Sequence, residues 1–367
     1  MTAEAAASAG PPIVLVVGTG LMGTSVALAL AESGARVHLA DRDPAALALA
    51  ADLGAGSPQP PDQDPDVVVL AVPPRAVGPA VQTYQRRYPQ CIVTDLASTK
   101  SHVQAEVETL ADPRRFVGGH PLAGRERSGA GAARADLFQD RPWVLTPAPA
   151  TPSAAVTAVE DLVRRCGAQP VVMAPQRHDE AVALVSHAPQ VAASLVAARL
   201  TGADDDAVGL AGQGLRDVTR IAASDPGLWT EILVTNAPAV RAVLLELAAD
   251  LETVAAALGE AGDDPDDHGH QLVTDALRRG NQGHDRLPGK HGAPPAAYVT
   301  VPVVVPDRPG ELARILLAAG EAGVNVEDIA IEHSPGRPVG LVELAVRPEA
   351  ADRLAAALRA AGWSVHR

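Results

Sequence analysis

The sequence is short of residues that several classes of protein need. It has only two Phe, three Trp and three Tyr in 367 residues, too few for a surface that stacks on nucleic-acid bases. Its two cysteines, Cys91 and Cys166, cannot build a disulfide scaffold and fit a reducing cytoplasm. It has no uninterrupted apolar run of about 18 residues, so we expect no membrane span.

Positive charge is also scarce. The chain has 30 Lys and Arg against 44 Asp and Glu, a net charge of −14 at pH 7. Such a chain is a poor partner for a nucleic-acid backbone or an anionic membrane. Residues 1–10 contain no basic residue and do not resemble a signal peptide. We therefore expect a cytoplasmic protein of two or three domains, at about 100–200 residues per domain.

Two blocks make up the first two thirds of the chain. In residues 11–175, short β-branched runs alternate with Ala-rich stretches, and the runs are apolar on consecutive residues, as in strands covered on both faces. This pattern predicts a Rossmann-type, doubly wound parallel sheet. Residues 176–262 lose these runs and predict an all-α domain whose apolar surface needs a partner, such as a second subunit. Its expected helices are Asp179–Leu200, kinked at Pro189, then Asp204–Ala223, Pro226–Val234 and Pro238–Leu258.

The last third begins with a segment rich in Gly, Pro, Asp and His. Residues 263–297 predict a linker with one short helix, Gln271–Arg279. Four Asp and two His in residues 263–270 could hold a metal ion, but a solvated acidic linker is favoured and no metal site is predicted. Residues 298–367 follow the order βαββαβ, which is ferredoxin-like.

A glycine-rich turn follows the first predicted strand, in the string GTGLMG. Gly18 allows the tight turn, Gly20 lets the backbone approach a pyrophosphate, and Gly23 permits close helix–strand contact. Alone the motif is weak, but a strand precedes it, a helix follows it, and Asp41 stands 18 residues after Gly23. Together these features predict a dinucleotide site.

The acid after the second strand bears on which dinucleotide is bound. Asp41 is expected to bind a ribose 2′-hydroxyl and to repel a 2′-phosphate, which favours NAD over NADP. Arg42 beside it works against this preference. The predicted cofactor-binding residues are Gly18, Gly20, Leu21, Met22, Gly23, Asp41 and Arg42.

Polar residues follow the fourth and fifth predicted strands. Ser98 and His120 stand at carboxyl ends of strands, where open α/β sheets bind ligands, and could form a hydrogen-bonded pair. No G-x-S-x-G elbow surrounds Ser98, so nucleophilic hydrolysis is not predicted. The alternatives are a helix N-cap for Ser98 and an ordinary loop residue for His120.

The helical block adds cations and histidines. Arg216 and Arg220 are four residues apart and share a helix face, which suits a multiply anionic ligand. Surface ion pairs with Asp217 are the alternative. His178 and His187, taken by themselves, are more typical of packing residues than of ligand-binding ones.

Five strings together resemble the prephenate dehydrogenase family: VVGTGLMGTSVALAL, TDLASTK, GGHPLAGRERSG, RHDEAVALVSHAPQ and GLRDVTRIAASDPGLW. They occur in order between residues 16 and 229. A later string, VPDRPGELARILLAAGEAGVNVEDIAIEH, resembles an ACT domain, a module that typically pairs between subunits and binds an amino acid. Many members of the family carry one after the helical domain.

The resemblance implies NAD-dependent oxidative decarboxylation of prephenate to 4-hydroxyphenylpyruvate, a step of tyrosine biosynthesis. It implies that His120 holds the substrate's C4 hydroxyl and that Ser98 orients His120. Arg220 matches the arginine that grips a substrate carboxylate, and Arg216 assists it. Glu126 matches an acid near the pocket mouth.

One departure leaves the substrate open. Many relatives have a second histidine in the string SHLPH, where this chain has SHAPQ, so Gln190 stands in its place. Arogenate, or both arogenate and prephenate, therefore stay possible substrates. A 3-hydroxyacid dehydrogenase is disfavoured, because these enzymes usually rely on a catalytic lysine in the helical domain. No lysine occurs here between Lys100 and Lys290. A sensor of NAD and amino acids without catalysis is disfavoured because Ser98, His120 and Arg220 are all present.

The resemblance to an ACT domain implies a regulatory site. Asp307, Gly310 and Asn325 lie in the loops that would bind an aromatic amino acid, tyrosine or phenylalanine, at a subunit interface of a homodimer. The alternative is a dimerisation module without a ligand.

Overall fold

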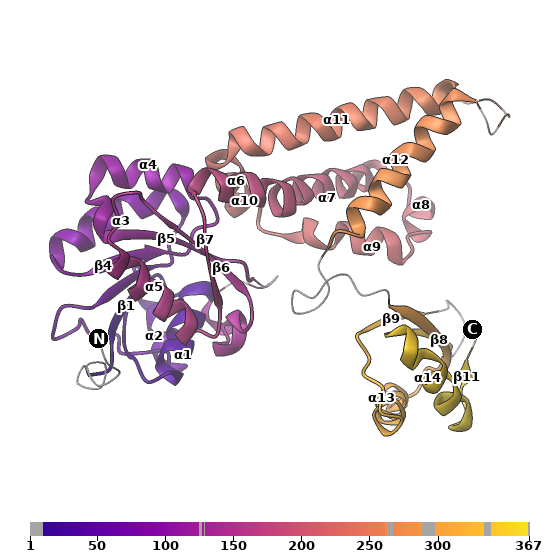
Figure 1. Cartoon of the computed structure of the whole chain (residues 1–367), viewed down its shortest axis with the longest axis horizontal. Coiled ribbons are helices and arrows are strands. Elements are labelled where there is room, and N and C mark those ends of the chain that lie inside the picture. Colours follow the sequence, from indigo (N-terminus) through magenta and orange to yellow (C-terminus); the bar gives the residue numbers. More distant parts are fainter. Residues whose placement is uncertain are drawn as a thin grey trace. The chain divides into compact units, whose positions relative to one another are not determined.

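The computed structural model describes residues 10–124, 127, 129–260, 262, 264, 267–287, 298–333 and 339–365 (Figure 1). The chain divides into two compact units, residues 1–249 and 250–367. The first contains a seven-stranded sheet and most of the helical block, and the second contains a four-stranded sheet.

The large sheet has the strand order β2-β1-β3-β4-β5-β6-β7. Neighbouring strands are parallel from β2 to β5, but β6 runs antiparallel to β5, and β7 is parallel to β6. The prediction of an all-parallel sheet is therefore wrong at this edge. The described part of the β5–β6 connection contains only 3-10 turns, with no crossover helix to carry the chain back along the sheet. The strands are β1 (Ile13–Val17), β2 (Arg36–Ala40), β3 (Val67–Leu70), β4 (Ile92–Asp95), β5 (Phe116–Pro121), β6 (Pro142–Pro147) and β7 (Gln169–Val172).

Helices cover both faces of this sheet (Figure 1). Helices α1 (Leu21–Glu32) and α5 (Ser153–Arg165) belong to one apolar cluster, and α3 (Pro74–Arg87) and α4 (Ser101–Leu110) to the other. Alternate residues of one strand enter different clusters, as Val14 and Val16 of β1 do on one face and Leu15 on the other. This explains why the strands are apolar on consecutive residues. Helix α2 (Pro44–Asp52) connects β2 toward β3.

The helical block is more broken than the sequence predicts. The expected helix Asp204–Ala223 is two short α-helices followed by the 3-10 turn Arg220–Ala223, since Gly209 and Gly212 flank the break. The expected kink at Pro189 takes the form of the π-turn Ala183–His187, because the proline ring would clash with a carbonyl one turn earlier. The helices are α6 (Pro175–Val182), α7 (Ala188–Ala198), α8 (Asp205–Gly209), α9 (Gln213–Thr219), α10 (Pro226–Thr235) and α11 (Ala237–Glu260).

One stretch of this block, Pro175–Gly202, is long and apolar enough to cross a membrane by length and composition alone, and so is the bent pair α10 and α11 taken together. Both stretches contain polar residues, so neither is an uninterrupted apolar run of the kind from which no membrane span was expected. One or two such helices are weak evidence for a membrane, because core helices of soluble proteins pass the same test. The stretch also contains the buried polar residues His178, Asp179 and Gln190.

The second unit corrects the predicted linker. Helix α12 (His268–His284) is longer than the expected Gln271–Arg279. It begins there because the Asp267 side chain accepts a hydrogen bond from the backbone N–H of His270. Arg279 of α12 also forms an ion pair with Asp250.

The remainder of this unit has the predicted order βαββαβ. Its antiparallel sheet has the order β11-β8-β10-β9, and residues of the sheet and of α13 and α14 share one apolar core. The elements are β8 (Val299–Pro306), α13 (Glu311–Glu321), β9 (Asp328–His333), β10 (Val339–Val346), α14 (Pro348–Ala360) and β11 (Ser364–Val365).

Candidate active site

The glycine-rich turn combines tight packing with open space. Gly18 has a φ of +95°, and a Cβ there would lie 2.2 Å from the carbonyl oxygen of Ala71. A Cβ at Gly23 would lie 1.9 Å from the carbonyl oxygen of Gly18. By contrast, nothing lies within 4 Å of the Cβ position of Gly20. Two glycines are therefore required by the fold, and the third leaves room for a ligand.

This open space lies in front of the first turn of α1. Gly20 is the N-cap and provides no side-chain cap, and Leu21 and Met22 begin the helix. Backbone N–H groups in a first helical turn have no partner within the helix, and the helix dipole favours a negative charge there. The turn can therefore hold a phosphate group.

Asp41 ties the end of β2 to this turn. Its Oδ2 accepts hydrogen bonds from the Thr19 backbone N–H at 2.5 Å and the Thr19 hydroxyl at 2.9 Å, and its Oδ1 accepts one from the Asp43 backbone at 2.8 Å. Burial raises the pKa of Asp41, but the hydrogen bonds from Asp43, Thr19 and Arg42 outweigh it and lower the pKa below its usual value. A carboxylate thus stands beside the turn, and the neighbouring Arg42 is exposed.

The candidate residues follow the sheet edge in a definite order. Asp41 follows β2, the glycine-rich turn follows β1, Ser98 follows β4, and His120 lies near the end of β5. Because strands β2 to β5 are parallel neighbours, their carboxyl ends share one edge. An extended dinucleotide can therefore run from Asp41 across the turn toward Ser98 and His120.

A buried ion pair organises the loop that carries Ser98. Lys100 is fully buried, and its Nζ contacts the Asp95 carboxylate and donates a hydrogen bond to the Gly119 carbonyl at 2.7 Å. Asp95 also accepts hydrogen bonds from the backbone N–H groups of Ala97 and Gly119. Burial lowers the pKa of Lys100, although Asp95 and Asp179 act in the opposite direction. The pair joins the end of β4 to the residue before His120.

His120 contacts a different partner from the one predicted. Its Nδ1 lies 2.8 Å from Nε2 of His178, and Nδ1 of His178 lies 2.8 Å from Oδ1 of Asp179. The half-buried Ser98 makes no hydrogen bond to His120 in the part of the chain that the structure describes. The expected hydrogen bond between Ser98 and His120 is therefore not found among the described residues, and Nδ1 of His120 contacts His178 instead. The role of Ser98 stays a prediction.

Asp179 in turn is held by two other elements. Its carboxylate accepts hydrogen bonds from the backbone N–H groups of Lys100 and Ser101, both at 2.8 Å, where α4 begins. Asn236, between α10 and α11, donates to the Asp179 carbonyl at 2.9 Å and lies 3.1 Å from Nδ1 of His187. Burial raises the pKa of Asp179, but hydrogen bonds from His178, Ser101 and Lys100 lower it overall.

Two histidines at the site, His120 and His187, have lowered pKa values. Burial, followed by His178, Lys100 and His187, lowers the pKa of His120 well below 6.5. Burial lowers the pKa of His187 to about 4 against the opposing charge of Asp179. His120 is partly exposed. It can therefore meet a ligand as a neutral imidazole, able to accept a proton.

The helical block contributes an amide and two arginines. Gln190 is buried, and its Nε2 donates a hydrogen bond to the Ile221 carbonyl at 3.0 Å, which fixes the 3-10 turn that Arg220 begins. Arg220 and Arg216 are exposed, and Arg216 lies in the last turn of α9. Their shared helix face ends at Arg220, where the α-helix changes into the 3-10 turn.

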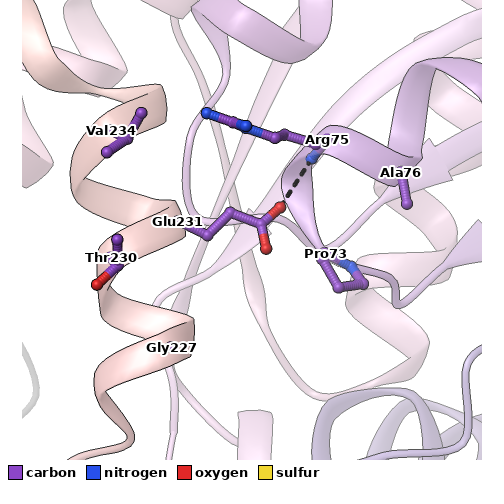
Figure 2. Close-up of a pocket in the computed structure, with 7 residues that line it drawn as sticks. All are labelled: Pro73, Arg75, Ala76, Gly227, Thr230, Glu231 and Val234. Atoms are coloured by element: carbon purple, nitrogen blue, oxygen red, sulfur yellow. Dashed lines mark hydrogen bonds between the residues drawn. The ribbon is translucent and has the colours of Figure 1, made fainter.

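A pocket of about 490 Å³ lies between the start of α3 and α10 (Figure 2). Pro73, Arg75 and Ala76 line it on one side, and Gly227, Thr230, Glu231 and Val234 on the other. The Arg75 backbone N–H donates a hydrogen bond to Glu231 Oε1 at 3.1 Å, so α10 caps the start of α3. The α3 side follows β3, which lies between β1 and β4, so the pocket opens at the same sheet edge.

The remaining predicted residues lie elsewhere. Glu126 is outside the described residues. In the second unit, Asp307, Gly310 and Asn325 are exposed. Gly310 has a φ of +89° and is the N-cap of α13, while Asn325 donates a hydrogen bond to Glu327 at 2.7 Å.

A glycine-rich turn before a helix, an acid after the second strand and a neutral histidine at the same sheet edge define a nucleotide-dependent oxidoreductase. Two family models match the chain: "Prephenate dehydrogenase, nucleotide-binding domain" at residues 26–172 and "Prephenate dehydrogenase, dimerization domain" at residues 174–270. The chain belongs to the prephenate dehydrogenase family, as its similarity to known relatives also shows.

Those relatives share much of the chain's length. The probable prephenate dehydrogenase NovF of Streptomyces niveus is 38% identical over 358 residues, covering 95% of this chain and 98% of that protein. The prephenate dehydrogenase of Bacillus subtilis is 31% identical over 249 residues, covering 66% and 64%. The crystal structure of A. aeolicus prephenate dehydrogenase in complex with hydroxyphenyl propionate and NAD+ has a TM-score of 0.67 and 27% identity, covering 76% of this chain and 98% of that one.

Proposed function

We propose that the chain oxidises and decarboxylates prephenate to 4-hydroxyphenylpyruvate with NAD. The observation that carries this proposal is the place of His120, a partly exposed neutral imidazole on the sheet edge that also bears the glycine-rich turn. Family membership gives the reaction, and this histidine gives the group that can accept the substrate's hydroxyl proton.

The residues of the turn fit NAD. Gly20 and the first turn of α1 would hold the pyrophosphate, and the Asp41 carboxylate would hold the ribose. Bound at these residues, NAD would supply the acceptor for the hydride that leaves C4 of the substrate. The negative charge of Asp41 disfavours the 2′-phosphate of NADP.

The chain's own residues hold and orient the substrate. His120 accepts the C4 hydroxyl proton as the hydride leaves, and returns it to the phenolic oxygen formed when the ring carboxylate departs as CO2. Ser98 follows β4 at the same sheet edge, and its proposed role is to contact the substrate hydroxyl or the nicotinamide. Arg220 binds a substrate carboxylate with help from Arg216, and Gln190 holds the Arg220 turn. Glu126 is proposed to stand near the pocket mouth.

The second unit is proposed to regulate this activity. Its βαββαβ order and strand order support an ACT domain. Asp307, Gly310 and Asn325 would then bind an aromatic amino acid. The proposed domains are residues 11–175 for NAD, a helical domain from residue 176 and the ACT domain at 298–367, with the helix α12 in the connecting segment. The matched dimerization domain supports a homodimer, and we propose a cytoplasmic location.

The test is NADH formation measured with prephenate and arogenate offered separately. We expect turnover with prephenate and a fall in kcat of about 100-fold or more for His120→Asn, since the base is lost. Turnover with arogenate alone would keep the mechanism and change the substrate, a result that Gln190 would then explain. No turnover with either substrate, by protein that binds NAD, would refute the proposal.

A further inference from the structure

Three side chains form a buried line that ends at the candidate base. The carboxylate of Asp179 contacts Nδ1 of His178, and Nε2 of His178 contacts Nδ1 of His120, each at 2.8 Å. The side chain of His178 is 1% exposed and that of Asp179 is 6% exposed. Water therefore has little access to the hydrogen bond between His178 and Asp179, which is stronger than it would be at the surface.

The positions of the protons follow from the acid at the end of the line. A carboxylate can only accept, so Nδ1 of His178 must carry its proton toward Asp179. Where His178 carries hydrogen on Nδ1 alone, its Nε2 can only accept. Nδ1 of His120 then donates to it, and Nε2 of His120 keeps its lone pair.

We propose that His178, backed by Asp179, is a positioning residue that holds the proton of His120 on Nδ1 and leaves Nε2 free to accept the substrate proton. This inference rests on the proposed role of His120 as the base. It gives a functional role to the adjacent residues His178 and Asp179. From the sequence alone, His178 is more typical of a packing residue.

The surroundings of the line favour this arrangement. Asp179 is anchored at the start of α4 by the backbone N–H groups of Lys100 and Ser101, so its carboxylate stays in place. When His120 accepts a proton, the imidazolium faces a line that ends in this negative charge. The charged and titratable neighbours of His120 are Lys100 at the start of α4, His178 on α6 and His187 on the π-turn. The charge of Lys100 is largely balanced by its contact with Asp95.

Nitrogen NMR of histidine-labelled full-length protein near pH 7.5 tests the proton positions directly, with His120→Asn used to assign the signals. We expect Nδ1 of His120 to bear hydrogen and Nε2 to be bare. A His120 with hydrogen on Nε2, or a doubly protonated His178, would overturn the proposal. This readout does not depend on turnover, so it can fail or succeed separately from the proposed function.

Kinetics of two His178 variants provide the second test. His178→Gln keeps an acceptor near the position of Nε2, and we expect kcat within about fivefold of the unmodified chain. His178→Leu removes the acceptor, and we expect kcat to fall by about 30-fold or more while the Kd for NAD changes less than about threefold.

His38→Gln is the control, because this histidine lies on β2 outside the site and its Nδ1 lies 2.8 Å from the Gln59 carbonyl oxygen. It is expected to leave kcat within about threefold. Equal losses for His178→Gln and His178→Leu, or an unchanged kcat in His178→Leu, would contradict the proposal. If His178→Leu does not fold, the kcat of His178→Gln and the NMR measurement still test the proposal.

Discussion

At the scale of single residues, the site depends on how each charge is surrounded. His120 and His187 have lowered pKa values because burial penalises their cationic forms, while Asp41 and Asp179 have lowered values because hydrogen bonds outweigh burial. These surroundings favour the neutral form of His120 and His187 and the charged form of Asp41 and Asp179. This combination suits a base that must accept a proton near neutral pH.

The pH dependence of the reaction follows from His120. Only the neutral imidazole can accept a proton, and its pKa lies well below 6.5. We therefore expect kcat/KM to stay level as the pH falls through 6.5, and to decline about tenfold per pH unit only at lower pH. Steady-state assays from pH 4.5 to 8 check this, with circular dichroism as a control for unfolding. An acid limb centred at 6.5 or above would contradict the burial of His120.

Arg220 is expected to act through substrate binding. Replacing Arg220 with alanine removes a cation from the carboxylate, so KM for the substrate should rise by a factor that corresponds to about 2–4 kcal/mol, with a smaller effect on kcat. Arg216→Ala is the matched control, with an expected change in KM below about fivefold. A larger rise in KM for Arg216→Ala than for Arg220→Ala would show that Arg216, and not Arg220, is the main ligand of the substrate carboxylate.

At the scale of elements, local patterns and long-range contacts differ in how well the sequence predicts them. The roles of Gly18 and Gly23 were predictable because a strand, a turn and a helix follow one another without a gap. The contact between His120 and His178 was not, since it joins residues 58 positions apart, one on strand β5 and one on helix α6. The antiparallel direction of β6 could not be predicted either, because an apolar run has the same composition whichever way the strand runs.

The glycines of the turn offer a test of the element itself. A methyl group at Gly23 would clash with the Gly18 backbone, whereas one at Gly20 meets no protein atom. We expect Gly23→Ala to lower Tm by several degrees, corresponding to a loss of about 1–3 kcal/mol. Gly20→Ala should keep Tm within about one degree and weaken NAD binding by about tenfold or more. Calorimetry and NAD titration of both variants separate fold from ligand, and equal effects would contradict these roles.

At the scale of the whole molecule, the helical block exposes apolar side chains that a single chain leaves in water. Leu210 is 87% exposed, Val185 68% and Leu184 62%. Such residues are the expected surface of the dimerization domain that the family model matches. The apolar stretch Pro175–Gly202 lies within this matched domain.

Removing the C-terminal sheet tests its proposed regulatory role. A chain that ends at Leu287 keeps α12 and its ion pair with Asp250. We expect its kcat to stay within about threefold of the full chain, and inhibition by tyrosine or phenylalanine to disappear. The full-length variant Asn325→Ala is the control for ligand binding without loss of the domain. Inhibition that survives the truncation would place the regulatory site in the first unit.

Asp41 has a consequence for attempts to redesign the coenzyme preference. Its Oδ2 is already occupied by Thr19 of the glycine-rich turn, and its Oδ1 by Asp43. An exchange of Asp41 for a smaller neutral residue would remove the charge that disfavours a 2′-phosphate and, in the same step, release Thr19 of the glycine-rich turn. A variant made for NADP would therefore need a new tether for Thr19 as well as a new partner for the phosphate.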